Sequence, residues 1–340
     1  MELSDRKKKI LQILVEEYIL EGTPVSSKKL HEKHLNEYSP ATIRNELFSL
    51  EELGYLSHTH TSSGRVPLPK AYRLYVDKLM EKGSLSLAEI NYIESHFTKN
   101  FTQAEDIVKN AAKVISELTN YTAIGFSEDS VDENIEGIRL VRLNAKNILL
   151  IIITNSHFIK DTVITCEYEI TDSYIETAEK ILSEVFQNKT IEQAANIDEQ
   201  LVEDKIKVYK ELFNSILQIF KNYTKNDNAK VVLEGSSNIL NYDEFMDKDK
   251  TKNFLSVIEK PEHLLSILKS ENNGLEISVK IGNDDTENLS DDLALVTANY
   301  KVNGKTLASS GVLGPIRMDY NRVFLVLDMI KKAIENIKED

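Results

Sequence analysis

Four residues in one short segment have side chains that could read the edges of nucleic-acid bases. The segment "SPATIRNELFSLEELG" begins at Ser39 and contains Ala41, Thr42, Arg44 and Asn45. In the major groove of DNA, asparagine can pair with adenine N6 and N7, and arginine can pair with guanine O6 and N7 or with a phosphate. Threonine can contact a thymine methyl group. If the segment is helical, these side chains would give the helix a base-reading face.

The spacing of apolar residues predicts that helix. Ser39 is a favourable N-cap, Pro40 fits the first helical position, and Gly54 is suited to end the helix. Apolar residues recur at helical spacing and should point inward, and the outward face should then contain the remaining polar residues. The inward residues are Ile43, Leu47 and Leu50; the outward ones are Ala41, Asn45 and Glu52, flanked by Thr42, Arg44, Phe48 and Ser49.

Acidic residues in the same segment leave a second interpretation open. Glu46, Glu51 and Glu52 would repel phosphates, so the outward face could be an ordinary solvated surface. Their position late in the helix should keep them out of the groove, because recognition helices contact bases mainly with their N-terminal residues.

A polar hairpin is predicted directly after this helix. The residues "HTHTSSGR" supply hydroxyl, amide and guanidinium groups that can bind phosphates, and Gly64 should permit the tight turn. Without DNA this would be only a polar hairpin. The predicted DNA contacts of the hairpin are His60, Thr61, Ser62, Ser63, Gly64 and Arg65. Arg73 in the next helix is a further predicted contact.

The first 82 residues are predicted to form a winged helix-turn-helix. Two helices, near residues 4–20 and 26–34, precede the segment at Ser39, and a fourth near residues 69–80 follows the hairpin. Charge agrees with this assignment: residues 1–80 hold 12 Lys and Arg against 11 Asp and Glu, whereas the rest hold 29 against 44. Since the chain as a whole carries a net charge of −14, contact with nucleic acid should be confined to the first segment.

The remainder reads as an α+β domain with a helical insertion. Helical and strand-like segments alternate through residues 83–172, helices dominate residues 173–228, and strands return in residues 229–340 before a last helix. The helices of the insertion carry more apolar surface than an isolated surface insertion would need. We therefore expect them to contact a second copy of the chain.

Other kinds of site are poorly supported by the sequence. "NGKT" at Asn303–Thr306 lacks the preceding glycine of a phosphate-binding loop and is better explained as a hairpin turn. The histidine pairs His31/His34 and His58/His60 have no cysteine nearby, so a zinc site is not expected. We expect no catalytic residues, metal or cofactor. No apolar run is long enough to span a membrane, and a cytoplasmic location is expected.

The quoted segments resemble a known family. "SPATIRNELFSLEELGYL", "HTSSGRVP", "YRLYVDKL" and the late "GVLGPIRMDY" closely resemble the heat-inducible transcription repressor family HrcA. The resemblance implies a winged helix, a GAF-like α/β domain formed by residues 83–172 and 229–340, and an inserted dimerisation domain at 173–228.

The resemblance also implies a function and partners. It implies a non-enzymatic repressor of chaperone operons that binds an inverted-repeat operator in double-stranded DNA as a homodimer and is released on heat stress. The chaperonin GroEL system would help the repressor reach its active form. An alternative is a repressor gated by a small ligand in the GAF-like domain.

Overall fold

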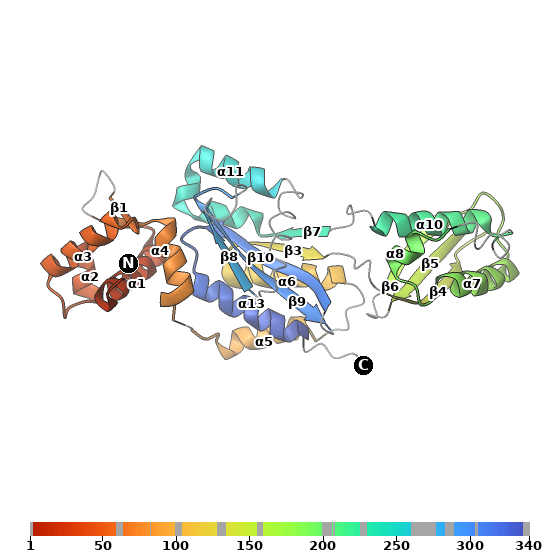
Figure 1. The fold of residues 1–340 in the computed structure, drawn as a ribbon, viewed down its shortest axis with the longest axis horizontal. Helices are drawn as coiled ribbons and strands as arrows, with labels where there is room; N and C mark the ends of the chain where they lie inside the picture. The colour runs from red at the N-terminus through yellow and green to blue at the C-terminus, as the bar shows by residue number, and fades with distance from the viewer. Residues whose placement is uncertain are drawn as a thin grey trace. The chain divides into compact units, whose positions relative to one another are not determined.

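The computed structural model is a mixed α and β structure, in agreement with the predicted α+β class. It separates into two compact units. Unit 1 contains Met1–Thr98, Lys109–Gly125 and Val231–Asp340, and unit 2 contains Lys99–Val108 and Phe126–Lys230 (Figure 1). The structure describes residues 3–58, 64–81, 83–98, 104–127, 134–154, 159–198, 206, 208–224, 230–259, 277–282, 289–302 and 305–335.

Three helices begin unit 1: α1 (Asp5–Glu21), α2 (Ser27–Lys33) and α3 (Pro40–Glu52). A serine precedes each helix, and its hydroxyl accepts a hydrogen bond from a first-turn backbone N–H that has no partner within the helix. The three helices enclose a small aliphatic core. Its buried side chains include Ile10, Leu11, Leu14, Val15, Leu30, Ile43, Leu47 and Leu50.

A two-stranded antiparallel hairpin follows α3. Strands β1 (Leu56–His58) and β2 (Arg65–Pro67) pair with His58 opposite Arg65, and Arg65 also exchanges two backbone hydrogen bonds of 2.9 Å with Val25. The backbone of Gly64 does not have a left-handed φ, and the turn before it lies outside the described residues. A Cβ at Gly64 would lie 2.7 Å from the carbonyl carbon of Pro24, so the close approach of two backbone segments requires glycine.

The next helix packs toward the centre of unit 1. Helix α4 (Pro69–Leu74) continues as a π-helical turn over Tyr75–Leu79. Tyr72 of α4 is fully buried, and its ring centroid lies 6.2 Å from that of Tyr320. The hairpin is thus followed by a helix anchored in the rest of the unit.

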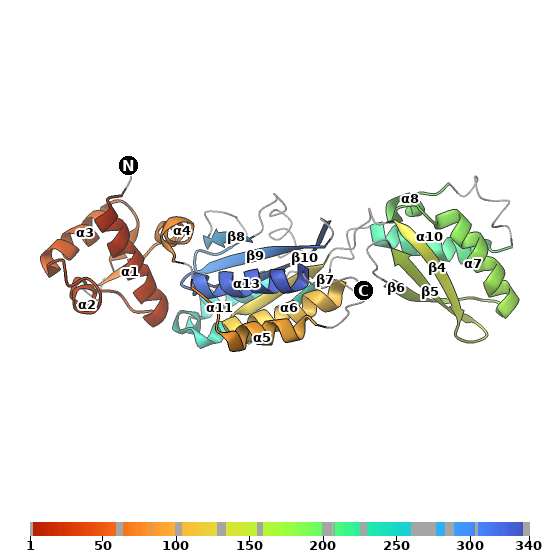
Figure 2. The same cartoon turned by 90° about the horizontal axis from the view of Figure 1, so that it is seen from below.

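A five-stranded sheet in the order β7-β3-β10-β9-β8 forms the centre of unit 1. Strands β9 and β10 form an antiparallel hairpin with Val302 opposite Lys305, and helices α13 and α5 lie on one face of the sheet (Figure 2). Helix α5 begins with a capping box formed by Ser86 and Glu89. The bounds are β3 (Thr122–Ser127), β7 (Lys230–Glu234), β8 (Ile277–Ile281), β9 (Leu293–Val302), β10 (Lys305–Pro315), α5 (Leu87–His96), α6 (Ala104–Thr119), α11 (Lys248–Ile258) and α13 (Tyr320–Glu335).

Unit 2 has its own three-stranded antiparallel sheet, in the order β4-β5-β6. The predicted boundary at residue 172 falls inside this unit, because the strands before it pack with the helices after it. A period of two indicates a strand but does not say which sheet it joins. The elements are β4 (Ile135–Arg142), β5 (Asn147–Thr154), β6 (Ile159–Thr165), α7 (Asp172–Phe186), α8 (Ile191–Ala195) and α10 (Lys210–Thr224).

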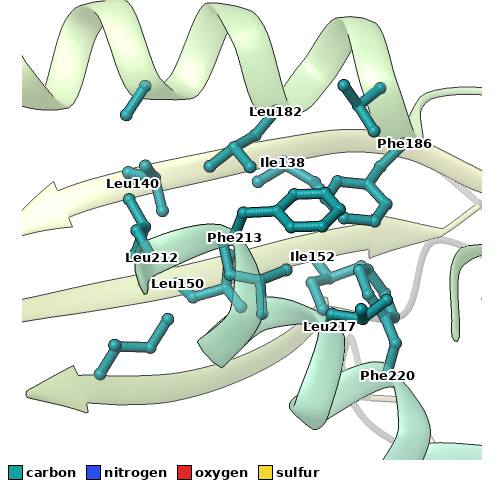
Figure 3. Packing of buried hydrophobic residues seen from close by; sticks show 14 of the residues in the cluster. Ile138, Leu140, Leu150, Ile152, Leu182, Phe186, Leu212, Phe213, Leu217 and Phe220 are labelled. Carbon is teal, nitrogen blue, oxygen red and sulfur yellow. The ribbon is translucent and has the colours of Figure 1, made fainter. Parts of the chain in front are cut away.

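The core of unit 2 is rich in aromatic side chains (Figure 3). Phe186 of α7 lies between two phenylalanines of α10, with ring centroids 5.5 Å from Phe213 and 5.0 Å from Phe220. Leu150 and Ile152 of β5 are buried in the same cluster. The apolar stripes of α7 and α10 therefore face the unit's own sheet, and the premise that they are left over for a second copy is wrong.

Candidate nucleic-acid interface

The N-terminus of α3 is held by a local network of hydroxyl groups. The Ser39 Oγ accepts a hydrogen bond of 3.1 Å from the Thr42 backbone N–H and lies 2.9 Å from the Thr42 Oγ1. Ser39 is exposed and Thr42 partly so. Both hydroxyls thus mark an accessible helix start, where partial positive charge favours anions such as phosphates.

The outward face of α3 carries side chains that have no partner within the described part of the chain. Ala41, Arg44 and Asn45 are exposed, as predicted, while Ile43 and Leu47 are buried on the opposite side. Among the described residues, nothing forms a hydrogen bond or an ion pair with the Arg44 guanidinium or the Asn45 amide. These two groups can therefore bind a ligand without first breaking an internal contact.

Two of the three glutamates in α3 are neutralised by basic side chains. Glu46 is only 8% exposed and accepts a hydrogen bond of 2.6 Å from the Arg6 Nε of α1. Glu51 lies 2.8 Å from the Arg65 Nε. Pairing of this kind reduces repulsion between α3 and an approaching polyanion. Glu52 remains exposed at the end of the helix.

Arg65 lies in the last strand pair before the turn, opposite His58. Its side chain is 14% exposed and its charge faces Glu51, so it is not the unpaired phosphate-binding cation that the sequence suggested. Its backbone is also fixed between β1 and Val25. The geometry gives Arg65 a role in holding the hairpin against α3. The other predicted contacts of the hairpin, His60, Thr61, Ser62 and Ser63, lie outside the described residues.

Arg73 points to the central sheet. Its Nη1 donates a hydrogen bond of 2.9 Å to the backbone carbonyl of Val279 on β8, a residue 206 positions later in the chain. The structure therefore brings Ser39, Ala41, Thr42, Arg44, Asn45 and the half-buried Ser49 together on α3, but it does not bring Arg73 to them. A local helical pattern contains no information about a partner so distant in sequence.

Most lysines near α3 are also paired within the protein. Lys9 lies 2.8 Å from Glu37, and Lys29 lies 2.8 Å from Glu17. Burial by itself would raise the pKa of Glu17, but hydrogen bonds from Lys29 and His34 outweigh this effect and lower the pKa to about 2. This carboxylate therefore stays charged and joins α1 to α2 at ordinary pH.

One residue of this surface was not identified as a contact from the sequence. The helical spacing predicted that Phe48 flanks the outward face, and in the structure it is 56% exposed. It was not named among the predicted DNA contacts. The available signal was a large aromatic residue outside the Ile43, Leu47 and Leu50 stripe.

The structure bears on the alternative sites as well. Lys305 and Thr306 continue as strand β10 paired with β9, which agrees with a hairpin and not with a phosphate-binding loop, since that loop is followed by a helix. Within the ranges described, no group of three or more His, Cys, Asp or Glu side chains could hold a metal ion. None of the helices in those ranges is both long and apolar enough for a membrane span.

Comparisons with known proteins point to one family. The family model named HrcA protein C terminal domain matches residues 105–324. The heat-inducible transcription repressor HrcA of Clostridium acetobutylicum is 36% identical over 338 residues, which cover 99% of this chain and 98% of that protein. The repressor of the same name from Clostridium tetani is 34% identical over 344 residues, covering 100% and 97%.

A solved structure shares the fold. A crystal structure titled as that of a hypothetical protein matches with a TM-score of 0.70 and 23% sequence identity, and the match covers 99% of this chain and 100% of the other. At this identity the likeness concerns the fold alone.

Proposed function

Because the chain belongs to the HrcA family of heat-inducible transcription repressors, we propose that it represses heat-shock operons by reading an inverted-repeat DNA operator with α3. The family is one of transcription repressors and not of enzymes. In this proposal, helices α1–α4 and the β1–β2 hairpin form a winged helix-turn-helix, and the five-stranded sheet with its helices forms a GAF-like domain. Helix α3 is then the recognition helix, and the hairpin is the wing.

One observation carries the proposal: α3 presents free hydrogen-bonding groups while its acidic neighbours are paired. Arg44 and Asn45 are exposed, whereas Glu46 and Glu51 face Arg6 and Arg65. The amide of Asn45 can form hydrogen bonds with an adenine, and Arg44 can form them with a guanine or a phosphate. This arrangement supports groove reading over the alternative of an ordinary solvated face.

The remaining predicted contacts have separate roles in the proposal. Ser39, Thr42 and Ser49 would contact the DNA backbone beside the bases, and Ala41 would leave room for the close approach of α3. His60, Thr61, Ser62 and Ser63 stay predicted phosphate contacts of the wing. Arg65 and Arg73 enter only as residues that position the hairpin and α4, because their charges already have partners.

We further propose that unit 2 forms the dimer contact through the outer face of its sheet. Val141, Leu149 and Val163 are direct cross-strand neighbours on that face, and Val163 is 54% exposed. Ile151 and Ile153 lie on the same face and are partly exposed. A contiguous apolar patch of this kind marks an interaction surface.

The charges around this patch suit a second copy of the same face. Arg139, Ile151 and Asp161 are opposite one another on β4, β5 and β6. A two-fold axis running along β5 would bring Arg139 of each copy, whose Nη1 already lies 2.7 Å from Glu179 of its own α7, over Asp161 of the other copy. The surface is thus self-complementary, as a two-fold interface must be. Two copies of α3 fixed by such an axis match an inverted-repeat operator.

The chaperonin GroEL system is the further partner in this proposal. Before the dimer assembles, the exposed valines of the outer sheet face leave apolar surface in contact with water. Exposed apolar surface makes an unassembled chain prone to aggregate, and a chaperonin would bind such a chain and prevent its aggregation.

Binding isotherms on operator and random duplex test the function. The operator is located first by a footprint on the DNA upstream of the protein's own gene. Asn45→Ala should weaken operator binding by about 1–3 kcal/mol and relax the preference at one base pair per half-site, while binding to random DNA changes little. Arg44→Ala should weaken operator binding too. Asn91→Ala, which truncates an exposed asparagine on α5, is the matched control.

The outcomes separate clearly. If Asn45→Ala and Arg44→Ala both bind every duplex like the parent protein, α3 is not a DNA reader and the proposed function falls. Thermal melts of each variant confirm that folding is unchanged.

A further inference from the structure

Phe48 is an exposed aromatic residue in the middle of the helix that we propose reads DNA. Its side chain is 56% exposed, and it is the only aromatic among the large exposed hydrophobic residues of the described chain. Its two neighbours in sequence are less exposed than Phe48, because Leu47 is buried and Ser49 is half-buried. Phe48 therefore contributes little to the core that holds α3 in place.

The geometry of a helix places Phe48 beside the free polar groups. It follows Asn45 by three positions, Arg44 by four and Ala41 by seven, and residues at these spacings share one face. At a rise of about 1.5 Å per residue, Phe48 lies about 4.5 Å further along the helix axis than Asn45. Base pairs are spaced by about 3.4 Å, so Phe48 would meet a base one or two steps from the one that Asn45 reads.

We propose that Phe48 is a specificity-determining residue that contacts the C5-methyl group of a thymine in each half-site. The proposal rests on the proposed function, because it requires α3 to enter the major groove. The thymine methyl is the one apolar group that the bases present there, and phenylalanine is among the side chains that contact it. The contact removes apolar surface of both partners from water, whereas any other base would place a polar edge against the ring.

Replacing thymine by uracil in the operator tests the contact directly, because it removes only the methyl group. A scan of single thymine-to-uracil changes is measured with the parent protein and with Phe48→Ala. One position per half-site should weaken the parent by about fourfold, since burial of one methyl group is worth about that factor. With Phe48→Ala the same change should have no effect, and the variant should bind the unmodified operator several-fold more weakly than the parent.

Two controls keep the result specific to Phe48. Leu87→Ala truncates an exposed apolar side chain on α5 and should leave both operator affinity and the uracil effect unchanged. Phe48→Leu keeps an apolar side chain of smaller reach and should retain part of the uracil effect. If Phe48→Ala melts at a lower temperature than the parent, Phe48→Leu replaces it in the comparison of the uracil effect. The uracil scan with the parent protein alone still tests whether a methyl contact exists.

Failure of this inference is distinct from failure of the proposed function. If the parent does not distinguish operator from random duplex, the function itself is wrong. If the parent is specific but no uracil change weakens it, or if the uracil effect is equal in parent and Phe48→Ala, the role of Phe48 is wrong while the repressor function stands.

Discussion

The helices at the start of unit 1 and the sheet of unit 2 differ in the kind of side chain that they expose. Around α3, carboxylates and basic side chains are joined in pairs such as Arg6–Glu46, and among the described residues Arg44 and Asn45 have no such partner. In unit 2, stacked phenylalanines fill one side of the sheet, and the other side exposes valines.

The difference shows how one chain can suit two kinds of partner. A polyanion is bound by unpaired donors and cations, so internal ion pairs decide which charges stay available. A protein partner is bound by apolar area, so the alternation of a strand decides which side chains stay outside. A substitution in one of these regions should therefore change the stability or binding of that region much more than that of the other.

The largest expected effect is on the core of unit 2. Phe213→Ala removes a fully buried ring that stacks on Phe186 and should cost about 3–5 kcal/mol of the free energy of unfolding. Hydrogen exchange followed by mass spectrometry should be faster in β4–β6, α7 and α10 and unchanged in α1–α3. Asn214→Ala, at the exposed neighbouring position on α10, is the control. Equal loss of protection in α1–α3 would show that the two regions are not independent.

The next effect concerns the outer sheet face. Val163→Asp places a charge in the proposed dimer contact and should give a folded monomer in sedimentation experiments. Because two linked copies of the proposed winged helix would gain effective concentration on the proposed two-fold operator, operator binding should fall at least about a hundredfold. Asn214→Asp adds the same charge to the exposed side of α10 and should remain a dimer. If Asn214→Asp dissociates while Val163→Asp does not, the helices form the interface.

A smaller effect is expected at the ion pairs between α1 and α2. The depressed pKa of Glu17, about 2 against an ordinary 4.5, means that its contribution to stability is present above pH 4.5 and is lost as the pH falls toward 2. Glu17→Gln should therefore cost roughly 2 kcal/mol at pH 7, and the difference from the parent should shrink between pH 4.5 and 2.

Urea unfolding at several pH values measures this difference. Glu52→Gln, which changes an exposed glutamate of α3, should cost little at any pH. A constant difference between parent and Glu17→Gln across the acid range would mean that the charge of Glu17 does not matter.

The smallest effect is expected at the ion pair between Arg65 of the hairpin and Glu51 of α3. If Arg65 mainly holds the hairpin through Glu51, Arg65→Ala and Glu51→Gln should each weaken DNA binding by less than about 1 kcal/mol, and the two changes should not add. The salt dependence of binding should barely change. A loss of about one unit of salt slope per wing with Arg65→Ala alone would instead favour the phosphate contact that the sequence suggested.

Much of α3 could be predicted because its signals are local. The Ser39 cap, the buried stripe of Ile43, Leu47 and Leu50, and the exposure of Asn45 all follow from interactions within a few turns of one helix. The same is true of the β9–β10 hairpin. The repressor family was recognisable for the same reason, because its characteristic residues stand in short continuous segments.

The fate of the charged side chains could not be predicted in this way. Arg65 and Arg73 both look like available cations in the sequence. In the structure Arg65 faces Glu51 and Arg73 donates a hydrogen bond to the backbone carbonyl of Val279. Each partner belongs to another element, so only the packing of those elements decides which cations remain free.

The sequence by itself determined the helices, their caps, the exposed polar face of α3 and the family, since each depends on neighbouring residues. The tertiary structure decided which sheet receives β4–β6 and which side of that sheet stays uncovered. It also decided that α7 and α10 turn their apolar stripes to their own sheet. The physical reason is that burial is a property of the assembled layers: a strand or helix has the same period whichever surface covers it.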